Sequence, residues 1–421
     1  MPSFSERSNK RHGIGGAIVG VIVVVVMIVS ALAGYYAAGT SISTTTTTSV
    51  STTTLPPVTT TVTVTGGVST SVSTSVQTTI PPPTLPSSLP SETISETGST
   101  LLYPLFNLWV PNFTTTYSNV RVNTAGTGSG TGISSAAAGT VQIGASDAYL
   151  TSSQASEYPN LLNIPLAISA QQINYNLPMI PSTTSLNFSG NVLAGIYNGS
   201  ISFWDNAAIK AINPGVASLL PHQTIVPIHR SDGSGDTFIF TSYLSDQSPD
   251  WAKTVGFATS VSWPSVPAAE GAIGNGGMVQ ACAQTEYSIA YIGISFFNNA
   301  KSAGLGHAHL KNAAGNYVDI TEANILSAAQ QETSSTPPDE TLSMVNAPGA
   351  NSYPIINYEY AIVGKTQADA NTALVVRTLL DWAILPAYGN SAYFLSQVGF
   401  VPLPPAIASL SYAQIAEIGP Q

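Results

Sequence analysis

Three loops of small residues stand out because each could hold an anion. They cover residues 98–100, 126–132 and 230–237, and each precedes a segment with the spacing of a helix. Glycine lets the backbone approach a ligand closely, and the first turn of a helix offers unpaired N–H groups and the positive end of its dipole. Any one loop alone could be an ordinary helix cap and turn. The three together, rich in serine and threonine donors, predict an oxyanion site, and none has the pattern of a nucleotide P-loop.

The third loop carries Arg230, one of only 11 lysine and arginine residues in the chain. A guanidinium presents a planar fork that can hold two oxygens of one oxyanion. The alternatives are an ordinary surface arginine or an ion pair with Asp232, two residues later in the chain. The surrounding glycines and hydroxyls favour a ligand.

Short apolar strands alternate with helices around these loops. Strands are predicted at residues 120–124, 141–145, 225–228 and 355–363, and helices at residues 101–109, 133–139, 237–244 and 370–384. This alternation is typical of α/β architecture. Because the stretch from residue 98 to the end is longer than a single core needs, we expect two α/β lobes.

The N-terminal region has the composition of a membrane anchor followed by a spacer. Three basic residues among positions 7–11 precede an uncharged apolar run at 14–38, which is long enough for a transmembrane helix. The basic flank places residues 1–13 in the cytoplasm and the rest of the chain outside. A cleaved signal peptide is the alternative, which would leave the protein periplasmic or secreted. Residues 39–95 are rich in Ser, Thr and Pro and predict a disordered stalk.

The charge balance and the single cysteine exclude several functions. The chain has 421 residues and a net charge of -10, with 21 acidic residues against 11 basic ones. This balance argues against a protein that binds duplex nucleic acid, which needs clustered basic charge. The lone Cys282 excludes an intrachain disulfide and a cysteine-based zinc site, and we expect it to be buried as a small apolar residue.

Other candidate residues are better explained without a ligand. His307 and His309 could bind a metal, but no third ligand has suitable spacing, so we expect a solvated loop. Trp204 and Trp382 are expected in the core. The Asp339–Glu340 pair is expected in a solvated loop.

Several segments resemble the substrate-binding proteins of high-affinity phosphate ABC importers, the PstS-type phosphate-binding proteins. The resemblance runs from about residue 98 to residue 405. It is carried by the segments 228–238 (IHRSDGSGDTF), 144–148 (GASDA), 196–199 (IYNG) leading to 203–205 (FWD), 290–293 (AYIG) and 353–355 (YPI). The resemblance implies a two-lobed periplasmic-binding-protein-like fold of type II with a hinge. The lobes would be residues 96–168 with 351–421, and residues 169–350.

The same resemblance implies a set of phosphate-binding residues. They are Thr100, Leu101, Ser129, Asp147, Arg230, Ser234, Gly235 and Asp236. Leu101 stands where the family usually has phenylalanine, which is tolerable if only its N–H is used. Asp236 stands where several members have threonine, so it could be a second acceptor or merely a helix cap.

A carboxylate such as Asp147 is favourable beside an anion only if the ligand carries a proton that the carboxylate can accept. Phosphate keeps a proton near neutral pH and sulfate does not, so a buried acceptor would reject sulfate. The alternative for Asp147 is a helix or turn cap.

The resemblance implies a monomeric binding module that delivers inorganic phosphate to the permease subunits of an ABC importer, with no catalysis, cofactor or metal. Two alternatives stay open. The protein could bind another oxyanion, such as sulfate or molybdate. It could also be a phosphate-ester hydrolase that uses Ser129 or Ser234, which would require a metal cluster or a serine–histidine pair.

Overall fold

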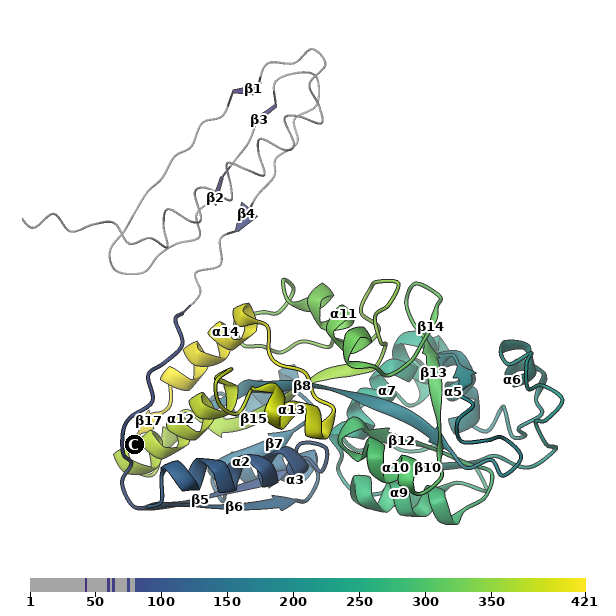
Figure 1. Cartoon of the computed structure of the whole chain (residues 1–421), viewed down its shortest axis with the longest axis horizontal. Coiled ribbons are helices and arrows are strands. Elements are labelled where there is room, and N and C mark those ends of the chain that lie inside the picture. Colours follow the sequence, from purple (N-terminus) through teal and green to yellow (C-terminus); the bar gives the residue numbers. More distant parts are fainter. Residues whose placement is uncertain (1–41, 44–58, 61–62, 65–73, 76–79) are drawn as a thin grey trace, which may run out of the picture. The chain divides into compact units, whose positions relative to one another are not determined.

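The computed structural model describes residues 42–43, 59–60, 63–64, 74–75 and 80–421 (Figure 1). The short segments before residue 80 are four strands, in which β1 (Ile42–Ser43) pairs with β3 (Thr63–Val64) and β2 (Thr59–Thr60) with β4 (Thr74–Ser75). The apolar run at 14–38 and most of the expected stalk lie outside the described residues. Within the described part of the chain, no helix combines the length and the apolar character that crossing a bilayer would require.

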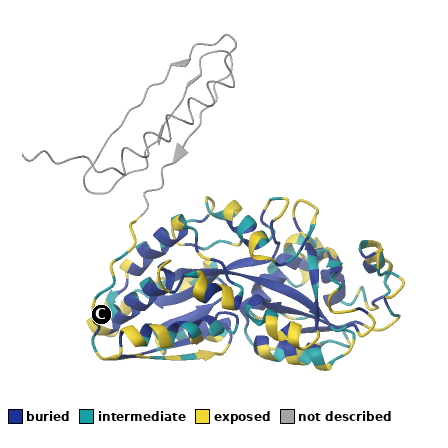
Figure 2. Ribbon diagram, in the orientation of Figure 1, coloured by how far each residue is buried: buried dark blue, intermediate teal, exposed yellow. Residues whose placement is uncertain are grey.

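From residue 80 onward the chain is built on a mixed sheet of eleven strands, which Figure 2 shows as the most buried part of the fold. Eight strands follow the order β11-β10-β12-β8-β15-β7-β5-β6, and β13, β9 and β14 extend it from the side of β8. The strands are β5 (Glu92–Gly98), β6 (Val120–Gly126), β7 (Ile143–Ser146), β8 (Leu161–Tyr175), β9 (Leu186–Phe188), β10 (Val226–Arg230), β11 (Glu270–Ala272), β12 (Ser288–Gly293), β13 (Gly306–Lys311), β14 (Tyr317–Val318) and β15 (Ile356–Gly364).

The long strand β8 belongs to two groups of strands. Its residues 161–170 pair antiparallel with β15, which in turn pairs with β7, next to the parallel strands β5 and β6. Its residues 171–175 pair antiparallel with β12, next to the parallel strands β10 and β11. In Figure 1, β8 accordingly crosses from one set of helices to the other. Strand β8 therefore carries the connection between two α/β halves.

Each group of strands is covered by its own helices. The first group packs against α2 (Tyr103–Thr116), α3 (Ser129–Ala137), α12 (Ala370–Ile384) and α14 (Pro405–Ala416). The second packs against α7 (Gly235–Gln247) and α9 (Gly274–Gln284), with α5 (Gly190–Tyr197) against α7. The remaining helices are α4 (Ser152–Glu157), α6 (Ala207–Ile212), α8 (Pro249–Thr254), α10 (Phe297–Ser302), α11 (Glu322–Glu332) and α13 (Ala392–Leu395), with 3₁₀ turns at Ile294–Phe296 and Ser396–Val398 and a short pair of strands β16 (Thr366–Gln367) and β17 (Gly419–Pro420).

Most predicted elements are confirmed, with shifted ends. The helix expected at 370–384 is α12, Ala370–Ile384, which Asp369 caps by accepting two backbone N–H groups. The helix expected at 101–109 is wrong at both ends, because α2 starts two residues later, at Tyr103, and continues to Thr116. The two tryptophans and the cysteine expected in the core, Trp204, Trp382 and Cys282, are buried.

The expected stalk is wrong at its C-terminal end. Leu89 is buried, the Tyr117 hydroxyl donates to the Pro86 carbonyl at 2.8 Å, and β5 begins at Glu92. The Pro- and Ser-rich composition up to residue 95 concealed a segment that contacts Tyr117, the residue after α2, and contributes Leu89 to the core. The folded part therefore begins before residue 92.

Two surface expectations are also wrong. His307 and His309 lie on β13 rather than in a loop, because Gly306, Ala308 and Leu310 alternate with them and are buried. Glu340 is fully buried, and its carboxylate accepts hydrogen bonds from the Gln414 amide at 2.7 Å and from the Ser411 hydroxyl.

Burial raises the pKa of Glu340 well above its usual value. The folded state then keeps a proton that the unfolded state releases, so the free energy of unfolding falls by about 1.4 kcal/mol per pH unit between the two pKa values. We expect Glu340→Gln to lose this slope, so that its stability relative to the wild type improves steadily as pH rises above about 4.5. Urea unfolding at several pH values measures this, with the exposed Glu157→Gln as control. A difference between Glu340→Gln and wild type that does not change with pH would contradict the expectation.

Candidate functional site

The first small-residue loop turns the chain from β5 into α2. Gly98 ends β5 with φ at +143°, and a Cβ there would lie 2.0 Å from the carbonyl oxygen of Ala145. Only glycine fits this conformation and this close approach to β7. The Ser99 hydroxyl then accepts hydrogen bonds from the backbone N–H groups of Leu101 at 3.1 Å and Leu102 at 2.9 Å. This turn leaves Thr100 between the two halves of the protein.

Thr100 meets a residue from α9. Its hydroxyl oxygen accepts hydrogen bonds from the backbone N–H of Asn275 at 3.2 Å and from the Asn275 side-chain amide at 3.1 Å. Leu101 is fully buried, and its N–H, expected to bind the ligand, is engaged by Ser99. The first loop and α9 thus touch across the interface of the two halves.

The second loop places Ser129 against Asp147. Ser129 is the first residue of α3, and Asp147 follows directly after β7. The Ser129 hydroxyl donates to Asp147 Oδ2 at 3.2 Å and accepts from the Asp147 backbone N–H at 3.1 Å. The Ser99 hydroxyl hydrogen-bonds the other oxygen, Oδ1. Within residues 80–421, the Asp147 carboxylate accepts no backbone N–H, so the alternative of a turn cap is not what the structure shows.

The third loop starts from Arg230 at the end of β10, whose side chain is only 1% exposed. Its Nε donates to Asp232 Oδ1 at 2.7 Å, Nη2 pairs with Asp232 Oδ2, and Nη1 donates to Asp236 Oδ2 at 2.9 Å. The ion pair with Asp232, which the sequence analysis left as an alternative, is therefore present. A guanidinium has five N–H donors, so one on each terminal nitrogen remains for a ligand.

Ser234 and Gly235 bring the third loop to Asp147. Ser234 is the N-cap of α7 and accepts from the Thr237 N–H at 3.3 Å, so the helix cap is Ser234 and not Asp236. A Cβ on Gly235 would lie 2.5 Å from Asp147 Oδ2 and 2.6 Å from Ser129 Oγ. Glycine is therefore required where the third loop meets the second.

Asp236 is held from several sides. Its Oδ2 accepts from Asn275 Nδ2 at 2.7 Å in addition to Arg230, and its Oδ1 accepts from Gln171 Nε2 at 3.1 Å. An ionised carboxylate offers about four lone-pair sites. One site on Oδ1 thus remains for a further donor.

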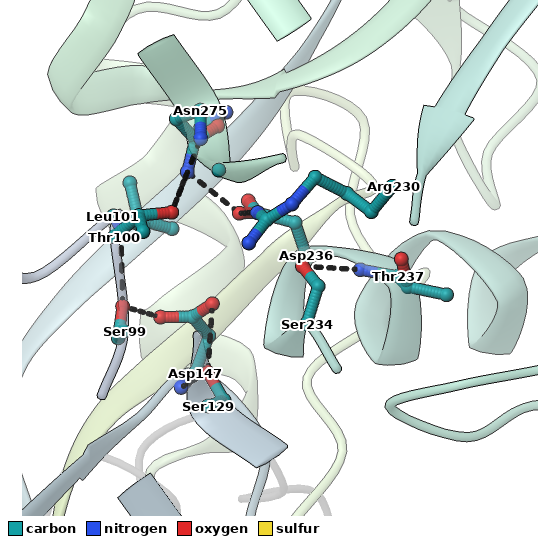
Figure 3. Close-up of polar contacts among 12 residues, drawn as sticks. Ser99, Thr100, Leu101, Ser129, Asp147, Arg230, Ser234, Asp236, Thr237 and Asn275 are labelled. Carbon is teal, nitrogen blue, oxygen red and sulfur yellow. Dashed lines mark hydrogen bonds and ion pairs between the residues drawn. The ribbon is translucent and has the colours of Figure 1, made fainter. Parts of the chain in front are cut away.

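The predicted residues therefore meet in one place. Figure 3 shows Thr100 and Leu101 on one side, Arg230 and Ser234 on the other, and Asp147 with Ser129 below them. The residues that the sequence analysis did not assign to this cluster are Ser99, Gln171, Asp232 and Asn275. The adjacent polar pair Gln171 and Gln172, inside a mostly apolar strand, was the available signal for one of them.

Burial dominates the electrostatics of the cluster. Burial and the nearby charge of Asp236 raise the pKa of Asp147 to about 7, while the Ser99 hydrogen bond and the charge of Arg230 act in the opposite direction. Burial also raises the pKa of Asp236, against the charge of Arg230. Asp232 is less buried, and its contacts with Arg230 outweigh burial and lower its pKa. The two buried aspartates therefore hold their protons more tightly than free carboxyls do.

Among residues 80–421, the hydroxyls of Ser129 and Ser234 contact Asp147 and the Thr237 N–H and no histidine. His229 contacts the carbonyl oxygen of Arg230 through Nδ1 at 3.1 Å and stacks on Trp263, and within residues 80–421 it pairs with neither Ser129 nor Ser234. In the same part of the chain no group of three histidine, cysteine or acidic residues is arranged to hold a metal ion.

Comparisons with known proteins give the family. A family model described as a PBP superfamily domain matches residues 40–385. The chain is 33% identical over 318 residues to the phosphate-binding protein PstS of Methanocaldococcus jannaschii, covering 72% of this chain and 80% of that one. It is 31% identical over 317 residues to PstS of Pasteurella multocida, covering 75% and 88%.

Solved structures share the fold. A high-affinity periplasmic phosphate-binding protein, solved with bound phosphate, matches with a TM-score of 0.59 and 23% identity over 76% of this chain and 93% of that chain. A phosphate-binding protein from Stenotrophomonas maltophilia matches with a TM-score of 0.58 and 18% identity, with the same coverage. The two-lobed α/β fold and the sequence relatives together show that this chain belongs to the PstS family of phosphate-binding proteins, within the PBP superfamily.

Proposed function

We propose that the protein captures inorganic phosphate outside the cytoplasm and delivers it to the permease subunits of a phosphate ABC importer. The observation that carries this proposal is the meeting of Arg230 with Asp147 and three helix starts in one buried cluster. PstS relatives at 31–33% identity support the same ligand. The protein acts as a binding module and not as an enzyme.

The donors of the cluster suit a phosphate. The two free N–H groups of Arg230 would take two phosphate oxygens. The hydroxyls of Thr100, Ser129 and Ser234, and the N–H groups of Leu101 and Gly235, would supply further donors once the ligand displaces the contacts that some of them now make with each other. We assign these residues to phosphate binding because their donors become available to the ligand when those contacts are displaced.

Asp147 would accept the proton of the bound phosphate. A buried carboxylate facing a fully ionised sulfate would be left without a donor, and the negative charges of the carboxylate and of sulfate would repel each other. We assign Asp236 to holding Arg230 in place, and its remaining lone pair could accept a second proton from dihydrogen phosphate.

The two lobes would be residues 96–168 with 351–421, and residues 169–350. Support comes from β8, whose pairing changes from β15 to β12 after Ala170, and from the return of the chain through β15. A hinge in these strands would let the lobes close on phosphate.

The N-terminal segment would tether the protein. The apolar run at 14–38 would anchor it, and the Ser-, Thr- and Pro-rich residues after it would hold the domain away from the membrane, as a monomer at the cell surface. Cleavage of the run would instead leave a periplasmic or secreted protein. Mass determination of the protein recovered from both the membrane and the soluble fractions distinguishes the two.

Phosphate should close the lobes. We expect the radius of gyration measured by X-ray scattering to fall when phosphate is added, and to stay unchanged on adding phosphate to Arg230→Ala at the same concentration. Identical scattering curves of the wild type with and without phosphate would contradict hinge closure.

Arg230→Ala should weaken phosphate binding more than any other single substitution. Truncating one partner of a desolvated charge pair costs about 2 to 5 kcal/mol. Calorimetric titration measures the loss, with the exposed Arg121→Ala as control and thermal unfolding to show that both variants fold. A loss of affinity below about tenfold, or ~1.4 kcal/mol, would overturn the assignment of Arg230.

Asp236→Asn should shift the pH dependence of phosphate binding. The charge of Asp236 raises the pKa of Asp147, so its removal lets Asp147 stay ionised to lower pH. We therefore expect the loss of affinity on the acidic side to occur at lower pH than in the wild type. The exposed Asp246→Asn serves as control. If the acidic limb, which is the fall of affinity at low pH, moves to higher pH in Asp236→Asn, the expectation is contradicted.

A further inference from the structure

A second buried carboxyl group lies near Asp147, on β15, the strand that pairs with residues 161–170 of β8. Glu359 is fully buried on β15, at the point where the pairing register of β15 with β8 shifts between Glu359 and Tyr360. The Asn357 side-chain amide donates both to its Oε1 and to the backbone carbonyl of Asp147, and each of the two carboxyl groups shifts the pKa of the other. Two buried carboxylates held so close would repel each other, so the pair is favourable when one of them keeps a proton.

The groups that donate hydrogen bonds to Glu359 are neutral. Its Oε1 accepts from the Ser169 hydroxyl at 2.5 Å and from the Asn357 amide at 3.1 Å. Its Oε2 has no donor among the described residues and is shielded from solvent. Asn357 also donates to the backbone carbonyl of Asp147 at 3.2 Å, so the two acidic residues are held by the same amide.

The surroundings decide which of the two acids carries the proton. Asp147 receives hydrogen bonds from two hydroxyls, and the charge of Arg230 favours its ionised form. Glu359 has no cationic partner among the described residues, and burial followed by the charge of Asp147 raises its pKa well above the usual value. These surroundings favour the proton on Glu359.

The other ionisable groups facing the pair are few. Asp236 acts on Asp147 from α7 and raises its pKa. Tyr149, from the loop after β7, and Tyr360, from β15, line the same crevice as Asp147 and Asn357, and burial raises the pKa of both phenols. With both phenols neutral, the state of the pair depends on Glu359 and on the charges of Arg230 and Asp236.

We propose that Glu359 is a positioning residue that donates its carboxyl proton to Asp147 in a hydrogen bond and so keeps Asp147 ionised and oriented to accept the proton of phosphate. Glu359 would then set the selectivity for phosphate over sulfate without touching either ligand. This inference rests on the proposed function of the site, and it adds a residue that the loop motifs do not include.

Two variants separate the donor role from the bulk of the side chain. Glu359→Gln keeps an N–H donor of nearly the same shape but cannot ionise. Glu359→Met keeps the volume and has no donor. The buried Glu340→Gln, away from the cluster, controls for the removal of a buried carboxyl group.

Calorimetric titration of the full chain with phosphate and with sulfate, from pH 5 to 8, tests the proposal. For Glu359→Met we expect roughly tenfold or greater loss of phosphate affinity at pH 7 and a lower phosphate-to-sulfate affinity ratio. We also expect the fall of affinity at low pH to move to higher pH, because Asp147 loses a donor to its charged form. For Glu359→Gln we expect affinity within about threefold of the wild type and an unchanged ratio.

The outcomes distinguish this inference from the proposed function. Wild-type protein that binds no phosphate would overturn the proposed function itself. Wild-type binding combined with a Glu359→Met variant of unchanged ratio and pH profile would overturn only the role of Glu359.

A spectroscopic readout covers the case in which Glu359→Met fails to fold. Carboxyl ¹³C chemical shifts of ligand-free protein labelled at aspartate and glutamate should show a protonated glutamate at pH 7 that disappears in Glu359→Gln. If the signal persists in that variant, or if Glu359 titrates as an ordinary exposed carboxyl, the proposal is wrong.

Discussion

The whole site depends on how one buried guanidinium is shared among carboxyl groups. Arg230 contacts Asp232 and Asp236, and the Asp147 carboxyl lies close enough to feel the charges of both Arg230 and Asp236. Three carboxyl groups therefore stand against a single cation at a place proposed to hold an anion. Charge attraction alone cannot hold the ligand there, so hydrogen bonds and the positions of protons must supply the affinity and the selectivity.

The fold meets this demand by bringing three helix starts together from distant parts of the sequence. Close packing at Gly98 and Gly235 brings the backbone of the first loop against β7 and the third loop against Asp147. The backbone N–H of Gly130 donates to the carbonyl oxygen of Gly233 at 3.0 Å, which ties the second loop directly to the third. The contacts of Gly235 with Asp147 and of Gly130 with Gly233 join one half of the protein to the other, so the state of the site and the arrangement of the two halves are coupled.

The local part of this architecture could be predicted from the sequence, and the long-range part could not. The small-residue loops, Arg230 and the helix at 370–384 follow from composition and periodicity within short windows. Asn275 joins the cluster only because α9 packs against the first loop, and Gln171 because β8 crosses between the two groups of strands. The burial of Glu340 depends on Ser411 and Gln414 of α14, more than 70 residues later in the chain, so its neighbours in sequence gave no sign of it.

The most direct test is a competition titration of the wild-type protein, in which phosphate and sulfate are compared at pH 7 by calorimetry. If Asp147 is the acceptor of a ligand proton, phosphate should bind and a large excess of sulfate should leave its apparent affinity unchanged, because sulfate carries no proton near neutral pH. Sulfate that competes with phosphate at comparable concentrations would contradict the account, since the site would then select its ligand by charge and shape and not by the ligand's proton.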